Sequence, residues 1–174
     1  CLPHPRIVRP ADIFGDERKN SIGINLADRK SRRQLLESMD VSSAAQRWQA
    51  TPIVGGEPRS GAESASVNPA DSGDVVGVCQ LATEEHVDEA LQLAVKAQPA
   101  WDRTAASERA AVLNKVADLY ESHTPELLTL CIKEAGKTLP DAVSELREAV
   151  DFLRYYAAQA RASFSEPVLM PGPT

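Results

Sequence analysis

The sequence predicts a mainly α-helical protein that contains one small β-hairpin. In the second half of the chain, apolar residues recur at three- and four-residue steps in three stretches, which is the spacing of one face of an α-helix. A threonine that can cap a helix precedes each stretch, at Thr83, Thr104 and Thr138. Between residues 64 and 80, two short strand-like runs flank the turn-forming segment Pro69–Gly73, which predicts the hairpin.

The composition is that of an ordinary globular protein. A chain of 174 residues with 43% hydrophobic and 25% charged residues can build one hydrophobic core. The net charge of -6 argues against nucleic-acid binding, which needs clustered basic residues, and we interpret the basic run Asp28–Arg33 as the solvated face of a helix. No apolar run approaches the roughly 20 residues that span a bilayer, and no signal segment opens the chain. We therefore expect a cytoplasmic protein without a transmembrane segment.

The two ends of the sequence indicate a segment of a longer polypeptide. The chain begins at Cys1 without an initiator methionine and ends on the turn-forming segment Met170–Thr174. Residues 1–50 are predicted to form a connector, or strap, with short helices. Residues 51–174 are predicted to form a second unit.

The first 26 residues are rich in Pro and Gly and lack a sustained hydrophobic period, which is typical of an extended connector. We expect this strap to dock on another surface through its apolar residues, which are Ile7, Val8, Ile13, Phe14, Ile22, Ile24 and Leu26. From Asp28 to about Trp48, the apolar spacing predicts a helix that is interrupted near Asp40–Ser43.

The second unit begins with turns in Thr51–Glu63, followed by the hairpin 64–80. Helices are predicted at about 83–98, 104–135 and 139–162. The first helix should stop before Pro99, with Trp101 at its end. The second should bend or restart at Thr124-Pro125 and end at Gly136, a good left-handed terminator.

The last helix carries two stripes of residues. Its apolar stripe is expected to face the core and consists of Leu139, Ala142, Val143, Leu146, Ala149, Val150, Leu153, Tyr156, Ala157 and Ala160. A second stripe mixes carboxylates with aromatic rings and consists of Glu145, Glu148, Phe152, Tyr155 and Gln159. In one interpretation the rings pack on a neighbouring element and the carboxylates lie at its wet rim. In the other, a carboxylate beside rings lines a ligand pocket.

Several motifs that could carry chemistry are incomplete. Gly136–Thr138 resembles the end of a phosphate-binding loop, but position 131 is Cys where that motif needs Gly. Surface or capping roles are predicted for the widely separated histidines His4, His86 and His123. No metal or disulfide pattern joins the cysteines Cys1, Cys79 and Cys131, and Cys131 is interpreted as a small core residue. The residues alone therefore predict no catalytic, cofactor-binding or metal site.

A series of short motifs resembles the start of an aldehyde dehydrogenase domain. These motifs are Asn68–Gly77, Val87–Leu91, Trp101, Glu108–Leu113 and Glu134–Thr138, in this order and spacing. Three further stretches resemble the bifunctional bacterial proline-catabolic enzymes of the proline utilization A family, namely Pro3–Ile7, Asp12–Ser21 and Glu148–Ala157. The resemblance covers nearly the whole chain. It implies that residues 51–174 are the N-terminal portion of an α/β, Rossmann-like aldehyde dehydrogenase domain.

The same resemblance implies an activity for the parent protein. Such enzymes oxidise L-glutamate-γ-semialdehyde, the open form of Δ1-pyrroline-5-carboxylate, to glutamate with NAD, after an FAD-dependent proline dehydrogenase module. The nucleophilic cysteine and the cofactor loops of the family come later in the chain, so this segment should bind neither cofactor and be inactive alone. Its expected partners are the remainder of the polypeptide and further copies, with Glu166–Met170 beginning the strands through which copies associate.

One site residue carries over from the resemblance. In pyrroline-5-carboxylate dehydrogenases, a glutamate on the helix that resembles Glu148–Phe152 lies at the aldehyde pocket, and Glu148 occupies the matching position. A carboxylate there would pair with the α-ammonium group of the semialdehyde.

An alternative of a different class is a self-contained helical interaction module without enzymatic activity. In this alternative, the mixed stripe of the last helix binds a partner helix or protein surface. The module would fold cooperatively and need no nucleotide, whereas a segment of a dehydrogenase would leave large apolar faces uncovered.

Overall fold

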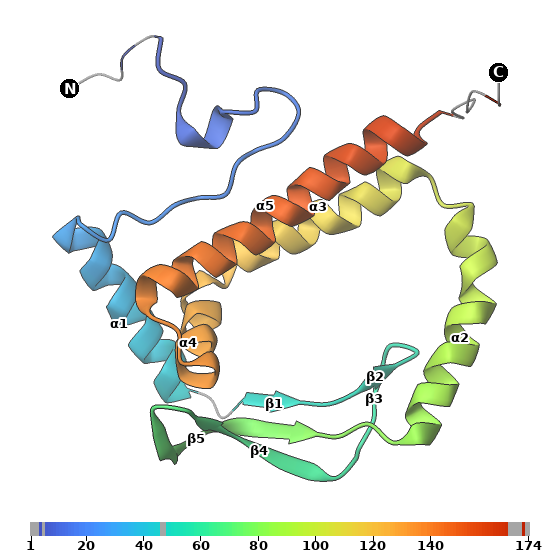
Figure 1. Ribbon diagram of the computed structural model, residues 1–174, viewed down its shortest axis with the longest axis horizontal. Helices are drawn as coiled ribbons and strands as arrows, with labels where there is room; N and C mark the ends of the chain where they lie inside the picture. Colours follow the sequence, from blue (N-terminus) through green and yellow to red (C-terminus); the bar gives the residue numbers. More distant parts are fainter. Residues whose placement is uncertain (1–3, 5, 46–47, 167–171, 173–174) are drawn as a thin grey trace.

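The computed structural model describes residues 4, 6–45, 48–166 and 172 of the chain. In Figure 1, helices α3 and α5 lie side by side, α1 and α4 lie at one end of this pair, and a small sheet follows below α4. The elements are η1 (Pro10–Asp12), α1 (Arg29–Ala45), β1 (Trp48–Ala50), β2 (Ile53–Val54), β3 (Glu57–Pro58), β4 (Glu63–Asn68), β5 (Asp71–Gln80), α2 (Glu84–Asp102), α3 (Ala106–Ser122), α4 (Thr124–Ala135) and α5 (Leu139–Phe164). The predicted class, mainly α with a small hairpin, is confirmed.

Small residues let α3 and α5 approach each other closely. Ala110 and Ala117 of α3 and Ala157 of α5 are completely buried. Because an alanine side chain adds little beyond the backbone, ridges of larger neighbours can fill the grooves between the two helices. The α3–α5 pair is therefore the rigid centre of the segment.

A second core joins α1 to α4 and to the start of α5. Leu35 and Met39 of α1 pack in one buried cluster with Leu128 of α4 and Ala142 of α5. The interruption predicted within α1 is wrong, since the helix runs unbroken from Arg29 to Ala45. The reason is local, because the hydroxyl groups of Ser38 and Ser42 donate to carbonyl groups one turn earlier instead of opening the helix.

The sheet has the strand order β1-β5-β4. β4 and β5 form the predicted antiparallel hairpin, and β1 adds to β5 in parallel, with Trp48 opposite Gly77. A side chain at position 77 would collide with the carbonyl oxygen of Trp48, so glycine is required there. The sequence did not predict β1, because Trp48 completed an apolar helical spacing.

The helix boundaries depart from the predictions at two places. α2 continues through Pro99 to Asp102 instead of stopping before the proline, and Trp101 is 53% exposed instead of plugging the helix end. A solvent-exposed helix tolerates the missing hydrogen bond because water can satisfy the free carbonyl group. Thr104 does not cap α3; its hydroxyl donates to the carbonyl of Ala100, and Ala105 precedes the helix.

The stretch predicted as one helix at 104–135 restarts, which was one of its two open alternatives. α3 ends at Ser122, α4 begins at Thr124, and His123 lies between them. Gly136 then ends α4 in the left-handed conformation at φ 66°, and Thr138 caps α5, as predicted.

The strap is attached differently from the prediction. Ile7, Val8, Ile13 and Ile22 are 61–70% exposed, so apolar burial does not hold most of the strap in place. Only Ile24 and Leu26 pack against the core, where they are half-buried. None of the helices in the described ranges combines the length and apolar character needed to cross a membrane.

Candidate functional site

Helix α5 presents three faces with different surroundings. One face packs against α3 through small residues such as Ala157, a charged face meets the strap, and a third face carries Glu148 and aromatic rings. The charged and aromatic faces are the two places where the segment concentrates polar chemistry on a rigid element.

The two carboxylates predicted on the mixed stripe differ in their surroundings. Glu145 accepts a hydrogen bond from Lys137 Nζ at 2.7 Å, and this bond raises the pKa of Lys137. Glu148 is exposed and has neither a hydrogen bond nor an ion pair among the described residues. Its charge is therefore available to an outside partner.

The aromatic rings next to Glu148 form an open cluster. Tyr156 lies edge-on to Tyr155, with ring centres 5.2 Å apart, and 6.1 Å from Phe152. All three rings are 40–58% exposed, and Tyr155 lies at the edge of the strap, with the Arg18 guanidinium carbon 5.9 Å from its ring centre. Phe152 and Tyr156 border a shallow hollow of about 310 Å³ between α3 and α5, which Glu148 does not line. The result is one wall of a site, not an enclosed pocket.

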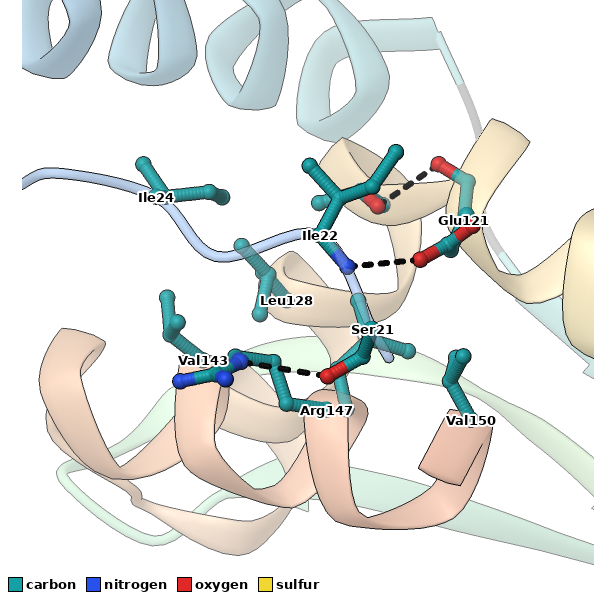
Figure 2. A pocket seen from close by; sticks show the side chains of 10 residues that line it. Ser21, Ile22, Ile24, Glu121, Leu128, Val143, Arg147 and Val150 are labelled. Atoms are coloured by element: carbon teal, nitrogen blue, oxygen red, sulfur yellow. Dashed lines mark hydrogen bonds between the residues drawn. The ribbon is translucent and has the colours of Figure 1, made fainter. Parts of the chain in front are cut away.

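The charged face of α5 binds the strap at Ser21, which is only 3% exposed. The carboxylate of Asp151 accepts two hydrogen bonds from this one residue, from the amide at 2.8 Å and from the hydroxyl group at 2.7 Å. Arg147 Nε donates to the same hydroxyl oxygen at 3.2 Å (Figure 2). Ser21 is thus held by a carboxylate and a guanidinium group at once.

A second carboxylate reaches the strap from α3. Glu121 Oε1 accepts a hydrogen bond from the amide of Ile22 at 2.8 Å (Figure 2). Arg154 of α5 is buried and donates to Glu121 at 2.7 Å and to Asp118 at 2.9 Å. Burial opposes the charge of Arg154, but hydrogen bonds to Glu121 and Asp118 outweigh it and raise the pKa of Arg154. This guanidinium therefore stays charged at any ordinary pH.

A cavity of about 120 Å³ lies beneath the strap where it crosses α4 and α5 (Figure 2). Its walls are mainly the apolar side chains of Leu128, Val143 and Val150, and its rim carries Ser21, Glu121 and Arg147. All three rim side chains already take part in the hydrogen bonds that dock the strap. The cavity is part of that docking site.

The predictions did not include the strap site, although one signal for it is present. Arg154 follows Val150 by four residues and precedes Ala157 by three, so helical spacing alone puts it on the buried face. A charged residue at a buried position needs a partner of opposite charge. The partners, Glu121 and Asp118, lie 33 and 36 residues away, and no sequence pattern identifies them.

Cys131 and His86 have the roles that the sequence predicted for them, while Cys1 lies outside the described residues. Cys131 is half-buried against the α1–α4 core, and burial raises the pKa of its thiol, which keeps it protonated and weakly nucleophilic. His86 completes a reciprocal cap with Thr83 at the start of α2. Within the described residues, no group of His, Cys, Asp or Glu could hold a metal ion.

Comparison with known proteins identifies the class. Residues 57–171 match the model of the aldehyde dehydrogenase family, and the chain belongs to that family. It is 43% identical over 170 residues to the bifunctional protein PutA of Escherichia coli (strain K12). That match covers 98% of this chain and 13% of PutA, so the chain spans about an eighth of this relative's length.

Two solved structures resemble the segment. Proline utilization A (PutA) from Bdellovibrio bacteriovorus, inactivated by N-propargylglycine, matches with a TM-score of 0.77 and 28% identity over 82% of this chain and 15% of that one. The 1-pyrroline-5-carboxylate dehydrogenase from Thermus with bound NAD matches with a TM-score of 0.79 and 26% identity over 89% of this chain and 30% of that one. The segment therefore has the fold of part of an aldehyde dehydrogenase domain, as the sequence predicted.

Proposed function

We propose that this chain is the N-terminal part of the L-glutamate-γ-semialdehyde dehydrogenase module of a bifunctional proline-catabolic enzyme. The observation that carries the proposal is the 43% identity to PutA over 98% of the chain, which includes the strap as well as the dehydrogenase helices. A 1-pyrroline-5-carboxylate dehydrogenase without the bifunctional name, from Bacillus subtilis (strain 168), matches 56% of the chain. The Thermus dehydrogenase shares the fold over 89% of the chain, so it is the sequence identity within the strap that favours the bifunctional arrangement.

The proposed reaction is the NAD-dependent oxidation of the semialdehyde to glutamate, in the cytoplasm. NAD would accept the hydride, and a cysteine later in the polypeptide would attack the aldehyde. This segment has no Gly-x-Gly-x-x-Gly loop and its Cys131 is kept protonated, so the remainder of the polypeptide would hold NAD and supply the nucleophile. FAD would belong to a companion proline dehydrogenase module.

Within that enzyme, Glu148 would bind the substrate. Its carboxylate would pair with the α-ammonium group of the semialdehyde, and the neighbouring rings would shield this ion pair from water. The exposure of Glu148, its lack of a partner among the described residues and the open ring cluster next to it support this role. Copies of the complete enzyme would associate through strands that begin at Glu166–Met170, of which residues 167–170 lie outside the described ranges.

The test is steady-state kinetics of the complete polypeptide, with NADH formation followed at increasing Δ1-pyrroline-5-carboxylate. Glu148→Gln keeps the shape of the side chain and removes its charge, so we expect KM for the semialdehyde to rise about 10-fold, which is roughly 1.4 kcal/mol of lost binding, with a smaller change in kcat. Glu108→Gln, an exposed glutamate of α3, is the matched control.

Two results would count against the proposal at different levels. A complete polypeptide that produces no NADH from Δ1-pyrroline-5-carboxylate would contradict the dehydrogenase assignment. Full activity with an unchanged KM in Glu148→Gln would remove Glu148 from the substrate site and leave the reaction assignment intact. The isolated 174-residue segment should produce no NADH in the same assay.

A further inference from the structure

The strap needs an explanation for its fixed position, because among its large apolar residues only Ile24 and Leu26, at its downstream end, pack against the core. Its large side chains Ile7, Val8 and Ile13 are 61–70% exposed. Fixing an extended segment costs backbone conformational entropy, which other contacts must offset. In the stretch Arg18–Ile22 the compensation comes from hydrogen bonds and ion pairs.

The docking site accepts hydrogen bonds from the backbone amides of two consecutive strap residues. The amide of Ser21 donates to Asp151 of α5, and the next amide, of Ile22, donates to Glu121 of α3, each at 2.8 Å. Neighbouring amides of an extended chain point in opposite directions, so two acceptors on two different helices are needed. The strap therefore binds the α3–α5 pair as a unit.

The docking site also forms hydrogen bonds with the side chain at position 21. The hydroxyl group of Ser21 donates to Asp151 and accepts from Arg147 Nε, and the residue is 3% exposed. Only a small hydroxyl side chain can make both bonds in so little space. At Gly23, even a methyl group would already contact the Arg147 guanidinium carbon, at 3.6 Å.

Two guanidinium groups extend the docking site on the upstream side, and Arg18 Nε and Nη1 are buried there without a hydrogen-bond partner among the described residues. Arg18 Nη1 lies 3.6 Å from Asp151 Oδ1, and its guanidinium carbon is 3.6 Å from the centre of the Phe14 ring. Arg154 Nη1 approaches the carbonyl oxygen of Asn20 at 3.5 Å while Glu121 and Asp118 balance its charge. The strap thus contributes one cation and the helices contribute both signs.

We propose that the α3–α5 pair is a sequence-specific docking site for residues 18–24 of its own polypeptide. This docking site, defined by Glu121, Arg147, Asp151 and Arg154, anchors the polypeptide upstream of Arg18 to the helix that carries Glu148. The proposal concerns the attachment of the strap and does not depend on the reaction that the complete enzyme catalyses.

Hydrogen exchange in the complete polypeptide tests the proposal. Ser21→Ala removes the two side-chain hydrogen bonds from the strap without changing α3 or α5, and Asp151→Ala removes the acceptor from α5. We expect the amides of residues 20–23 to exchange at least about 10-fold faster in both variants, because each variant removes hydrogen bonds to charged side chains that hold the strap on the helices. Asp88→Ala on α2, an exposed aspartate without a described partner, is the matched control and should change nothing.

Limited trypsin digestion provides a second measurement on the same variants. Arg18 is half-buried in the docked strap, so cleavage after Arg18 should be slow in the unmodified protein and at least about 10-fold faster in Ser21→Ala. Unchanged exchange and unchanged cleavage in Ser21→Ala would overturn the proposal. If Asp151→Ala fails to fold, Ser21→Ala still decides the question, since its substitution lies in the strap.

Discussion

Two charged faces of the same helix, α5, have opposite surroundings in this segment. On the strap face, Arg147, Asp151 and Arg154 all have hydrogen-bond partners within the described chain. On the other face, Glu148 has none and the rings next to it stay half-exposed. The charged side chains of α5 on the strap face thus find their partners within the segment, whereas the Glu148 face remains open to a partner from outside it.

The difference shows what kind of interaction each face supports. A half-buried carboxylate that accepts two hydrogen bonds from one residue, as Asp151 does, stabilises one fixed structure. An exposed carboxylate without a partner contributes little to stability and can be used for binding. The substitutions below test whether the two faces differ in this way.

The largest effect is expected from breaking the strap face at Arg154. Arg154→Met would leave the Glu121 carboxylate, whose side chain is 18% exposed, without its strongest partner. We expect the free energy of unfolding of the domain to fall by about 3 kcal/mol, measured by urea denaturation of the complete polypeptide. Arg103→Met, at the exposed end of α2, is the control. An equal loss of unfolding free energy in both variants would mean that Arg154 contributes only its charge to the protein as a whole and not its specific contacts with Glu121 and Asp118.

The next largest effect concerns the apolar packing of α3 against α5, the helix to which both faces belong. Ala117 is completely buried between α3 and α5, so Ala117→Leu would force the helices apart and should cost about 1–3 kcal/mol. Ala111→Leu, on the exposed side of α3, changes the same atoms and should be nearly neutral. Thermal unfolding of the two variants gives the comparison, and similar melting temperatures would contradict the close packing.

A pair of isosteric substitutions one helical turn apart compares the two faces directly. Asp151→Asn removes the charge that faces Arg18 and weakens the contacts to Ser21, so we expect a loss of about 1–2 kcal/mol. Glu148→Gln should change the free energy of unfolding by less than about 0.5 kcal/mol, because its side chain is exposed. Denaturation midpoints of the two variants measure the difference. A larger loss from Glu148→Gln would reverse the assignment of the faces.

The smallest effect concerns pH and the Lys137–Glu145 pair next to the Glu148 face. The hydrogen bond to Glu145 raises the pKa of Lys137 above its ordinary value of 10.5. A raised pKa means that this contribution to stability is complete below pH 10.5 and is lost as the pH rises through the folded-state pKa. In Glu145→Gln, NMR titration of the Lys137 ammonium group should show a lower pKa. Glu148→Gln should leave that pKa unchanged, and a shift there would mean that Glu148 also contacts Lys137.

The sequence predicted the elements whose signals are local. Thr138 and Gly136 mark the boundary between α4 and α5, and the segment Pro69–Gly73 marks the hairpin, because caps and turns depend on a few neighbouring residues. It failed where solvent exposure or a distant contact overrides a local preference. Pro99 did not end α2, and Trp48 became part of β1 because β5 provides a partner strand.

The candidate site divides in the same way. Glu148 and the rings could be found because they share one helical stripe and match a family motif. The strap site could be found only in part, since the position of Arg154 on the buried face is visible in the spacing but its partners are not. The prediction that the strap docks through its apolar residues holds only for Ile24 and Leu26, because composition does not reveal which strap residue meets a half-buried carboxylate.

The sequence by itself determined the helices, the hairpin and the resemblance to an aldehyde dehydrogenase domain. These features depend on periodicity, caps and motifs within short stretches of chain. Only the tertiary structure decided on which face of α5 the charged side chains find partners within the segment and on which face Glu148 is left without one among the described residues. The contact that closes the strap face joins Ser21 to Asp151 across 130 residues, and such a contact follows from the packing of α3 against α5.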